Sequence, residues 1–537
     1  MKRRDVIKDL SLLPLAGSVM ISKKPAGEKP SAKTDVAASK EIYQAIGVEP
    51  IINCRGTCTI IGGSIERPEV RAAMDAAAQV FVQYDELAFG AGKRLAELTG
   101  AEWGMVSAGC AAGMKHVTAA CVTGGNPEKL VRIPDLSGFE KTEVIIPAYS
   151  RNVYDHALRN VGVTLITVDS IEELTNAISS RTAMIYLMAG DESMSGPMSL
   201  EAISKIAKKK NIPVMIDAAA EDLTIPNVHL KMGADVVIYS GGKALCGPQC
   251  AGLVLGRKDL VMSAWQASAP HHGPGRDNKV GREETMGMVA AVEAWTKRDH
   301  AGEWKRWLSW LDNISKRVSG IESVKTTVVE PKEQLSNRTP QLRISWDPAK
   351  LNITGEDIAE LFGRTKPRIA LGGGSRAGET FISITTGQMQ PGDDKVVADR
   401  LVEVLSQKRT PQKSEMVAAA VSLKGHWEAT IEFFSSKSTH TLMIEQDGNW
   451  LQGSHKGEFS VRELLGTVEG NEFKMRSTDR QPGDAITFLF SGTVKDDVMT
   501  GSIYMGEYMT AKFTAKKYKF KYKREKIFIP SGPPLAT

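Results

Sequence analysis

Short apolar runs alternate with longer amphipathic stretches over residues 41–299 of the chain. A short apolar run bounded by turn residues is typical of a buried strand, and apolar residues spaced three and four apart are typical of a helix. Their alternation predicts a mainly parallel α/β sheet with helices on its faces. The predicted strands are Trp103–Ser107, Leu130–Ile133, Glu143–Ile146, Thr164–Val168, Ala183–Met188, Pro213–Asp217, Asp235–Tyr239 and Gly252–Leu255, and the predicted helices include Arg67–Tyr84, Gly90–Thr99, Ser199–Lys209 and Glu283–Lys297.

The tryptophan-rich stretch His300–Arg317 predicts a long amphipathic helix that leads into a smaller α+β domain. Strand-like runs at Gln341–Trp346 and Thr380–Thr385 and a closing helix at Asp393–Ser406 complete that domain. After a polar linker, Gln407–Lys413, polar and apolar residues alternate in short runs between glycine-containing turns, which predicts a small antiparallel barrel or sandwich. Those runs are Trp427–Phe434, Thr439–Gln446, Gly466–Lys474, Asp484–Val494 and Thr500–Lys516.

These shifts in pattern divide the chain into consecutive parts. Residues 1–40 form a leader and linker, residues 41–300 a large domain and residues 301–410 a small domain. Residues 421–520 form the β-rich domain, and residues 521–537 a basic, proline-containing tail. A chain of 537 residues with 42% hydrophobic residues is long enough to bury more than one core.

Charge and cysteine usage narrow the classes of partner. The net charge of +5 is small for this length and does not by itself imply a nucleic-acid partner. No apolar run is long enough to span a bilayer as a helix, so no membrane partner is expected. The cysteines include no Cys-x-x-Cys pair, and Cys54/Cys58 and Cys246/Cys250 lack further metal ligands nearby. We therefore expect free thiols and no metal.

The N-terminus resembles a twin-arginine export signal. Lys2-Arg3-Arg4-Asp5-Val6-Ile7-Lys8 precedes a mildly apolar stretch, Leu10–Ile21, and a polar segment that runs to Ser39. Paired arginines, apolar residues and a lysine are typical of such signals, and a basic, unstructured N-terminus is the alternative. The twin-arginine machinery moves folded proteins, so a cofactor could be loaded before export. The expected location is the periplasm, with the cytoplasm as the alternative.

Two predicted strands end in side chains that serve one kind of chemistry. Pro213–Asp217 ends in a carboxylate, and Asp235–Tyr239 is followed by Ser240-Gly241-Gly242-Lys243-Ala244. A lysine amine forms a Schiff base with the aldehyde of pyridoxal phosphate, and an aspartate keeps the pyridinium nitrogen protonated so that the ring can withdraw electrons. This pairing predicts an enzyme that uses pyridoxal 5'-phosphate, with Lys243 and Asp217 as its catalytic residues.

The segment Ser107-Ala108-Gly109-Cys110-Ala111-Ala112-Gly113 joins a predicted strand to a helix. Its small residues would let backbone N–H groups at the helix N-terminus approach a phosphate, whose charge the helix dipole favours. The candidate cofactor ligands here are Ser107, Gly109, Cys110 and Ala111, and the hydroxyl of Ser240 is another candidate donor.

His156, in Tyr154-Asp155-His156, is a candidate for stacking on the free face of the pyridine ring. The alternative is a residue at a helix start that is satisfied locally.

Taken together, several segments resemble the selenocysteine-synthase-like branch of fold-type I pyridoxal-phosphate enzymes, which includes L-seryl-tRNA(Sec) selenium transferase and D-glucosaminate-6-phosphate ammonia-lyase. The resemblance covers residues 41–407 and is most specific at Gly242-Lys243-Ala244-x-x-Gly247-Pro248-Gln249. It implies that Lys243 is the Schiff-base lysine, Asp217 the pyridinium partner, and Ser107 to Ala111 the phosphate cradle. The other segments are Asn53–Thr57, Leu95–Gly100, Tyr154–Ala157 and Ile216–Glu221.

Within that branch the sequence favours a small-molecule substrate over aminoacyl-tRNA. The net charge is nearly balanced, and the predicted signal directs export from the cytoplasm, where aminoacyl-tRNA is found. The segment Glu41–Ile51 also leaves little room for a tRNA-binding domain. The predicted reaction is β-elimination from an amino acid or amino-sugar acid, giving a 2-keto acid and ammonia. The alternatives are selenium transfer to a tRNA-bound residue, racemisation, aldol cleavage, and a non-catalytic role carried by the β-rich domain.

Arg55 and Arg368 are candidates for binding the substrate carboxylate, because a planar guanidinium binds a carboxylate through two parallel hydrogen bonds. Each could equally be a surface or interface arginine. The loop Pro270–Gly275 and the charged segment after it correspond to a region that reaches the partner subunit in this fold type, so a homodimer or higher homo-oligomer is expected.

Overall fold

The computed structural model describes residues 40–331, 333–411, 415–478, 486–519, 526–529 and 531–532. The predicted export signal, within residues 1–39, and most of the predicted tail lie outside these ranges. Two compact units make up the chain, Met1–Ile51 and Ile52–Thr537, and residues 40–44 of the first are helical. Among the described residues, no helix has the length and apolar character needed to cross a membrane.

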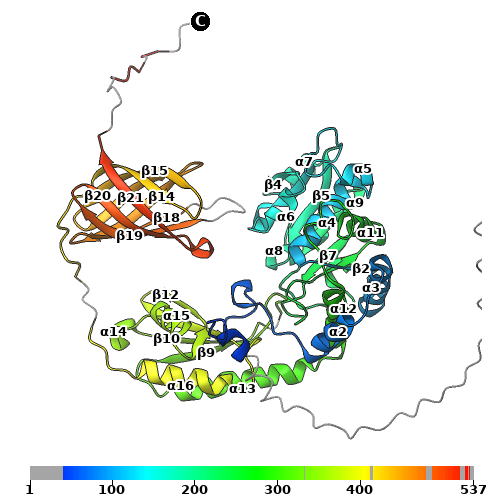
Figure 1. Cartoon of the computed structure of the whole chain (residues 1–537), viewed down its shortest axis with the longest axis horizontal. Helices are drawn as coiled ribbons and strands as arrows, with labels where there is room; N and C mark the ends of the chain where they lie inside the picture. The colour runs from blue at the N-terminus through cyan, green and yellow to red at the C-terminus, as the bar shows by residue number, and fades with distance from the viewer. Residues whose placement is uncertain are drawn as a thin grey trace, which may run out of the picture. The chain divides into compact units, whose positions relative to one another are not determined.

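A seven-stranded sheet forms the centre of the large domain, in the order β2-β8-β7-β6-β5-β3-β4 (Figure 1). Every pair from β7 to β4 is parallel, whereas β8 runs antiparallel to both β2 and β7. The mainly parallel sheet predicted from the sequence is thereby confirmed. Its strands are β2 (Trp103–Ser107), β3 (Glu143–Pro147), β4 (Thr164–Val168), β5 (Thr182–Met188), β6 (Val214–Asp217), β7 (Val236–Ser240) and β8 (Gly252–Gly256).

Helices cover both faces of this sheet because successive strand residues point into two different cores. Ile216 and Val237 belong to one core, and Met215 and Ile238 belong to the other. The first core is closed by α2 (Pro68–Ala78), α3 (Tyr84–Thr99), α9 (Leu200–Lys209) and α12 (Arg282–Lys297). The second is closed by α4 (Cys110–Thr123), α6 (Asp155–Arg159) and α11 (Lys258–Ala267). Shorter helices are α7 (Ile171–Ala177), α8 (Asp191–Met194) and α10 (Val228–Lys231).

The predicted strand Leu130–Ile133 is wrong. A short helix, α5 (Pro127–Leu130), occupies this place and is followed by a turn. The Asn126 side chain accepts a hydrogen bond from the backbone N–H of Glu128 at 3.0 Å, and the proline ring sets the backbone of the first helical residue. Leu130 is buried, but the apolar residues after it are not, so the run offers no continuous face to a sheet.

The predicted helix Arg67–Tyr84 is also too long. The helix α2 ends at Ala78, and α3 begins at Tyr84. Residues 80–82 between them are apolar but exposed, with Phe81 93% exposed, so they belong to neither helix face. The apolar residues between the two helices therefore made the predicted helix longer than the observed one.

The small domain is an antiparallel sheet covered by helices. Its strand order is β12-β13-β10-β9, and its core receives Leu311, Ile314 and Val318 from the long helix α13. A separate two-stranded pair joins β1 (Ile51–Asn53) to β11 (Arg368–Ala370). The remaining elements are β9 (Lys325–Val329), β10 (Gln341–Trp346), β12 (Gly372–Arg376), β13 (Glu379–Thr385), α13 (His300–Val318), α14 (Pro348–Leu351), α15 (Gly355–Arg364) and α16 (Asp393–Leu405).

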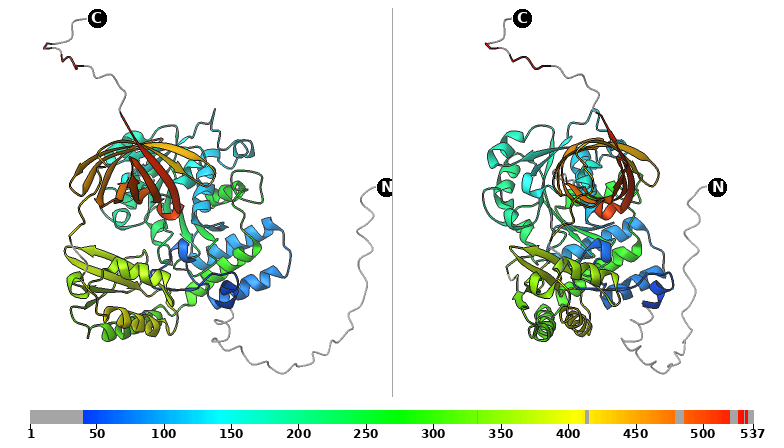
Figure 2. Two further views of the ribbon diagram at one scale, coloured as in Figure 1. Left: turned by 60° about the vertical axis from the view of Figure 1, so that its left-hand side comes forward. Right: turned by 90° about the vertical axis from the view of Figure 1, so that its left-hand side faces the viewer.

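The β-rich domain is a closed barrel of eight antiparallel strands, which Figure 2 shows end-on as a ring. The sequence was compatible with either a barrel or a sandwich, and the pairing of the first strand, β14, with the last, β21, shows that the domain is a barrel. Two of the predicted runs each span two strands. The strands are β14 (Gly425–Glu432), β15 (Lys437–Asp447), β16 (Trp450–Lys456), β17 (Val461–Glu469), β18 (Glu472–Thr478), β19 (Thr487–Lys495), β20 (Val498–Tyr504) and β21 (Thr510–Tyr518).

A chain of polar side chains lies inside this barrel. His440 Nδ1 is 2.7 Å from His455 Nε2, and His455 Nδ1 is 2.9 Å from Ser477 Oγ. Burial, with smaller contributions from His440 and Arg462, lowers the pKa of His455 to about 3. His455 therefore stays neutral in the folded barrel at a pH where it would be protonated in the unfolded chain.

Acid is expected to destabilise the barrel because of this histidine. Above pH 6.5, the ordinary histidine pKa, His455 is neutral in both the folded and the unfolded chain. Below pH 6.5 the unfolded chain binds a proton at His455 while the folded barrel does not, so stability is lost as the pH falls toward 3. The free energy of unfolding should fall by about 2 kcal/mol between pH 7.5 and pH 5. Urea denaturation read by hydrogen exchange of barrel peptides measures this change. His455→Gln should remove most of it, His426→Gln should not, and an equal pH dependence in the His455 variant would contradict the assignment.

Candidate active site

The ends of two neighbouring parallel strands bring Asp217 and Lys243 into one site. Asp217 is the last residue of β6 and pairs with Ile238 of β7, and Lys243 lies in the turn that follows β7. The Lys243 ammonium is close enough to lower the pKa of the Asp217 carboxyl, although other groups act on it more strongly. Both side chains therefore lie at the carboxyl edge of the sheet, where open α/β sheets bind their ligands.

The Asp217 carboxylate is buried and held by three donors. Its Oδ1 accepts hydrogen bonds from the Ala219 backbone N–H at 2.9 Å and from the Cys110 thiol at 3.3 Å, and its Oδ2 accepts one from the Tyr186 hydroxyl at 3.3 Å. Burial raises the pKa of Asp217, and these hydrogen bonds and Lys243 offset the rise only in part. A buried carboxylate with a raised pKa is suited to sharing a proton with a nitrogen base placed beside it.

Cys110 contacts this carboxylate through its side chain. It was predicted as a phosphate ligand, and its backbone N–H does lie at the start of α4, but its thiol points to Asp217. Removal from water, followed by the Asp217 charge, raises the pKa of the Cys110 thiol well above its usual value, so it acts as a neutral donor. All six cysteines are free, and no three metal-ligating side chains are grouped together in the described ranges.

The N-terminus of α4 fits a phosphate group. Its N-cap residue, Gly109, has a φ of +88° and offers no capping side chain, and the first turn carries no acidic residue. The Ser107 hydroxyl donates to the Gly109 carbonyl at 2.8 Å and so holds the turn that leads into the helix. The unsatisfied N–H groups and the helix dipole are thus left for an anion, next to the partly exposed Cys110 and the exposed Ala111.

Close packing explains the glycines beside Lys243. A Cβ at Gly242 would lie 2.6 Å from Gln249 Cα, and one at Gly241 would lie 2.7 Å from the Pro248 carbonyl oxygen. The Ser64 backbone N–H also donates to the Gly242 carbonyl at 2.9 Å. The Gly-Gly-Lys turn and the Gly-Pro-Gln segment therefore pack against each other, which fixes the backbone on both sides of Lys243. Ser240, predicted as a phosphate donor, is partly buried at the end of β7.

Tyr154 and His156 are the two aromatic candidates for stacking on the cofactor ring. Burial, followed by the charges of Asp217 and Cys110, raises the pKa of the Tyr154 hydroxyl, so this residue lies within electrostatic reach of the carboxylate. His156 is exposed on α6. Stacking by His156 stays a prediction, and Tyr154 is a second residue that sequence reasoning did not assign to the role.

The two arginines predicted for the substrate carboxylate keep their charges available. Arg55 is exposed and Arg368 is partly buried at the start of β11. Neither guanidinium forms an ion pair with a carboxylate in the described part of the chain. Neither forms a hydrogen bond or ion pair with Asp217 or Lys243 in the described part of the chain, and their role stays a prediction.

Sequence reasoning missed Tyr186 and Asn152. Tyr186 lies inside β5, two residues before the residue that pairs with Asp217, and its hydroxyl accepts a hydrogen bond from Asn152 Nδ2 at 3.3 Å. The alternation of β5 could have placed the tyrosine on one face of the sheet. The pairing of β5 with β6, which decides the contact, has no local signal.

Comparisons with known proteins find similar enzymes. The family model described as Cys/Met metabolism PLP-dependent enzyme matches residues 90–295. D-glucosaminate-6-phosphate ammonia lyase of Salmonella typhimurium is 28% identical over 326 residues, which is 59% of this chain and 85% of that protein. A solved structure of D-glucosaminate-6-phosphate ammonia-lyase covers 68% of this chain and 98% of its own, with 26% identity and a TM-score of 0.59.

Two further relatives carry other activities. The 5'-C-glycyluridine monooxygenase-decarboxylase of a Streptomyces species is 29% identical over 331 residues, covering 59% of this chain and 80% of that protein. L-seryl-tRNA(Sec) selenium transferase of Moorella thermoacetica is 22% identical over 413 residues, covering 67% of this chain and 82% of that protein.

The fold and site define a fold-type I enzyme that depends on pyridoxal 5'-phosphate. Within that class, the chain is similar to D-glucosaminate-6-phosphate ammonia-lyase and the L-seryl-tRNA(Sec) selenium transferases, which confirms the resemblance inferred from the motifs.

Proposed function

We propose that this chain is an ammonia-lyase that acts at Cα and Cβ of a 2-amino acid or an amino-sugar acid. The observation that carries the proposal is the Asp217–Lys243 pair at the ends of adjacent parallel strands, in a chain similar to D-glucosaminate-6-phosphate ammonia lyase over 85% of that protein's length. Pyridoxal phosphate, when bound at this site, would supply an aldehyde that reacts with amines and a ring that withdraws electrons from Cα.

The residues of the site divide the remaining work. The Lys243 amine would take the proton from Cα of the substrate. Asp217 holds a proton at the pyridine nitrogen, and Cys110 and Tyr186 hold Asp217 in place. The electron pair left at Cα forms the Cα–Cβ double bond as the β-hydroxyl leaves with a proton as water. The enamine product then takes up water and yields a 2-keto acid and ammonia.

The proposal is tested with purified, cofactor-loaded protein and a panel of 2-amino-3-hydroxy acids and amino-sugar acids, phosphorylated and unphosphorylated. Release of ammonia and a 2-keto acid in equal amounts is expected from at least one of them. Inversion at Cα or release of an aldehyde would instead indicate racemisation or aldol cleavage. A cofactor-loaded protein that releases neither product from the whole panel would contradict the proposal.

Selenium transfer is the second candidate function because selenium transferases are among the relatives. That activity requires tight binding of aminoacyl-tRNA, whose phosphates make binding strongly salt-dependent. A net charge of +5 over 537 residues favours the small-molecule function. A filter-binding titration with aminoacyl-tRNA at low and high salt separates the two, and tight, salt-dependent binding would favour the transferase.

We also propose that the enzyme is a homo-oligomer. Exposed apolar side chains gather on the segment from η1 (Thr59–Ile61) to α3, where Ile60 is 77% and Phe81 93% exposed. A second copy of the chain would remove this surface from water, as expected of an interface core. Light scattering of the holoenzyme measures the mass, and Phe81→Asp should shift it toward the monomer. A monomeric mass for the unmodified protein would contradict this proposal.

Export to the periplasm is proposed from the paired arginines Arg3-Arg4 alone. Replacing both by lysine should retain the protein in the cytoplasm, as cell fractionation would show. If the unmodified protein and the variant were divided equally between cytoplasm and periplasm, export by this route would be contradicted.

A further inference from the structure

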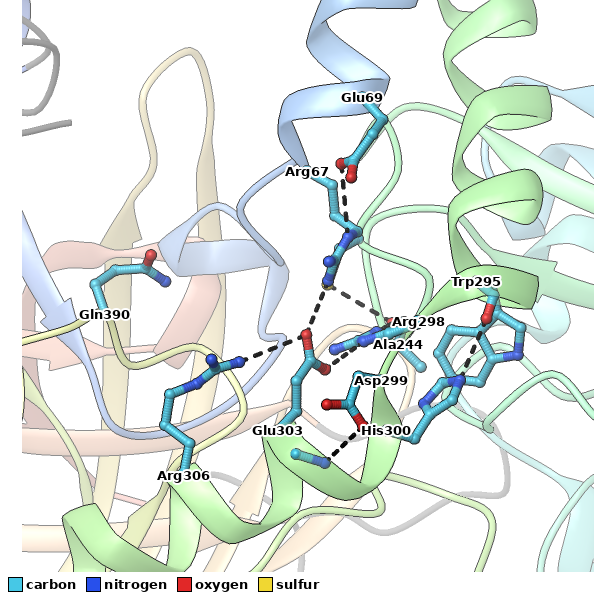
Figure 3. A network of polar contacts seen from close by, with 12 residues as sticks. Arg67, Glu69, Ala244, Trp295, Arg298, Asp299, His300, Glu303, Arg306 and Gln390 are labelled. Atoms are coloured by element: carbon cyan, nitrogen blue, oxygen red, sulfur yellow. Dashed lines mark hydrogen bonds and ion pairs between the residues drawn. The ribbon is translucent and has the colours of Figure 1, made fainter. Parts of the chain in front are cut away.

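Three charged side chains form a compact cluster beside the turn that carries Lys243. Glu303 accepts a hydrogen bond from Arg298 Nε through one carboxylate oxygen, and its other oxygen lies 3.1 Å from Arg67 Nη1. Figure 3 shows the Glu303 carboxylate between the Arg67 and Arg298 guanidinium groups, with the exposed Arg306 guanidinium 3.7 Å from the oxygen that faces Arg67. The side chains are 12%, 7% and 26% exposed for Glu303, Arg298 and Arg67, so the cluster, here called the Glu303 bridge, is largely shielded from water.

Both arginines of the Glu303 bridge hold the backbone next to Lys243. Arg298 Nη1 donates to the Ala244 carbonyl at 3.0 Å, and the backbone N–H of Arg67 donates to the Cys246 carbonyl at 3.1 Å. These carbonyls belong to the first and third residues after Lys243. One carboxylate thus fixes two arginines, and the arginines fix two points on one turn.

The charges favour a fixed geometry. Burial alone would raise the pKa of Glu303, but the adjacent Arg298 and Arg67 guanidinium groups outweigh it and hold the pKa below its usual value. The carboxylate is therefore ionised at neutral pH. A shielded ion pair of this kind contributes little net stability, yet removing one partner leaves an uncompensated charge, so it specifies geometry more than stability.

Glu303 belongs to a different domain from the turn that it holds. It lies in the first turn of α13, whose later residues Leu311, Ile314 and Val318 are buried in the small-domain core. The Lys243 turn belongs to the large sheet. A helix is a rigid rod over this length, so the position of the small domain and the position of the Lys243 turn are mechanically connected through Glu303.

We propose that Glu303 is a positioning residue for Lys243, acting through Arg298 and Arg67 and connecting the small domain to the lysine that carries the cofactor. The proposal rests on the proposed function only in requiring that Lys243 bind pyridoxal phosphate. It assigns no contact between Glu303 and substrate or cofactor. It predicts that neutralising Glu303 loosens the Lys243 turn and changes the environment of the lysine amine.

The first test needs neither cofactor nor substrate. Glu303→Gln keeps the size of the side chain and removes its charge. The matched control is Glu293→Gln, because the Glu293 carboxylate pairs with Arg94 at 2.7 Å and not with any residue of the described segment 240–249. In the apoprotein, hydrogen exchange of a peptide spanning residues 240–249 should be about tenfold faster in Glu303→Gln than in the control. The amides of Gly241, Cys246 and Gly247, each hydrogen-bonded within this segment or to Ala251, are the reporters.

The second test uses the cofactor-loaded protein. Glu303→Gln should raise the dissociation constant for pyridoxal phosphate about tenfold and shift the pH midpoint of the bound cofactor's visible absorbance. With a substrate in hand, kcat should fall about tenfold while KM changes less than twofold. Arg298→Lys keeps a charge but lacks the forked donors, so it should behave similarly, and the double variant should be no worse than either single one.

A merely structural role gives a different result. If the melting temperature of Glu303→Gln falls while exchange over residues 240–249 and the cofactor's pH midpoint match those of the control, Glu303 does not position Lys243. If no substrate is ever found, the exchange rates and the cofactor affinity still decide the matter. Failure of the lyase function and failure of this proposal are therefore distinguishable.

Discussion

Replacing Lys243 by alanine is expected to abolish covalent attachment of pyridoxal phosphate and to reduce elimination by about 10³-fold or more. In the proposed mechanism Lys243 supplies both the amine that binds the cofactor and the base that takes the Cα proton, and loss of a positioned base alone costs about 10²–10⁴-fold. Borohydride reduction followed by peptide mapping measures the attachment. Ammonia release from the best substrate measures the activity.

A matched control is available on the surface of the same domain. Lys208, exposed on α9, can be changed to alanine without touching the site, and this variant should keep both properties. Added ethylamine should restore part of the Lys243→Ala activity, because a free amine can replace the missing base. Borohydride-stable cofactor recovered on another lysine of Lys243→Ala would overturn the assignment of the site.

The second large effect is expected at Asp217. Asp217→Asn should lower turnover by about 10²–10³-fold, because a neutral amide cannot hold a proton at the pyridine nitrogen with the strength of a buried carboxylate. Covalent attachment at Lys243 should persist, since it requires only the amine. Single-turnover measurements of Cα proton exchange with deuterated solvent isolate this step. An Asp217→Asn enzyme with turnover close to that of the unmodified one would show that the ring nitrogen needs no carboxylate here.

The same substitution is expected to stabilise the protein without cofactor. Burial raises the pKa of Asp217 in the folded protein above the value of 3.8 that it has in the unfolded chain. As the pH rises, Asp217 therefore loses its proton in the unfolded chain first, and the ionised carboxylate destabilises the fold at neutral pH. The melting temperature of the Asp217→Asn apoprotein should therefore exceed that of the unmodified apoprotein at pH 7.5, and the difference should vanish near pH 4. Asp191→Asn, at an exposed position, is the control and should change neither. A lower melting temperature at pH 7.5 for Asp217→Asn would contradict the assigned direction of the pKa shift.

Much of the fold was predictable because it follows from local patterning. Apolar runs located every strand of the large sheet, and the change to alternating polar and apolar residues after residue 413 located the β-rich domain. The errors fell where local pattern and tertiary packing disagree. Leu130–Ile133 is apolar enough for a strand, but its first residue ends a short helix that starts at a capped proline, and residues 80–82 are apolar yet exposed. Closure of the barrel also required a pairing between its first and last strands, which no local signal encodes.

The candidate site shows the same division. Asp217 and Lys243 were predicted as catalytic residues from the sequence because Asp217 ends one apolar run and Lys243 closely follows the next, which is where a pyridoxal-phosphate enzyme carries a carboxylate and a lysine. Cys110 and Tyr186, which contact Asp217, are separated from it by 107 and 31 positions along the chain, respectively. The Glu303 bridge likewise joins residues separated by 236 positions.

The sequence by itself determined the class of enzyme and the cofactor, and it predicted the two residues proposed to carry the chemistry, since strand-end motifs and residue types are local properties. Only the tertiary structure decided which groups tune that chemistry. Strand order set the hydrogen bonds around the Asp217 carboxylate, and the packing of α13 against the large domain placed Glu303 beside the Lys243 turn. Such contacts depend on distances between segments remote in the chain, and residue order alone does not specify those distances.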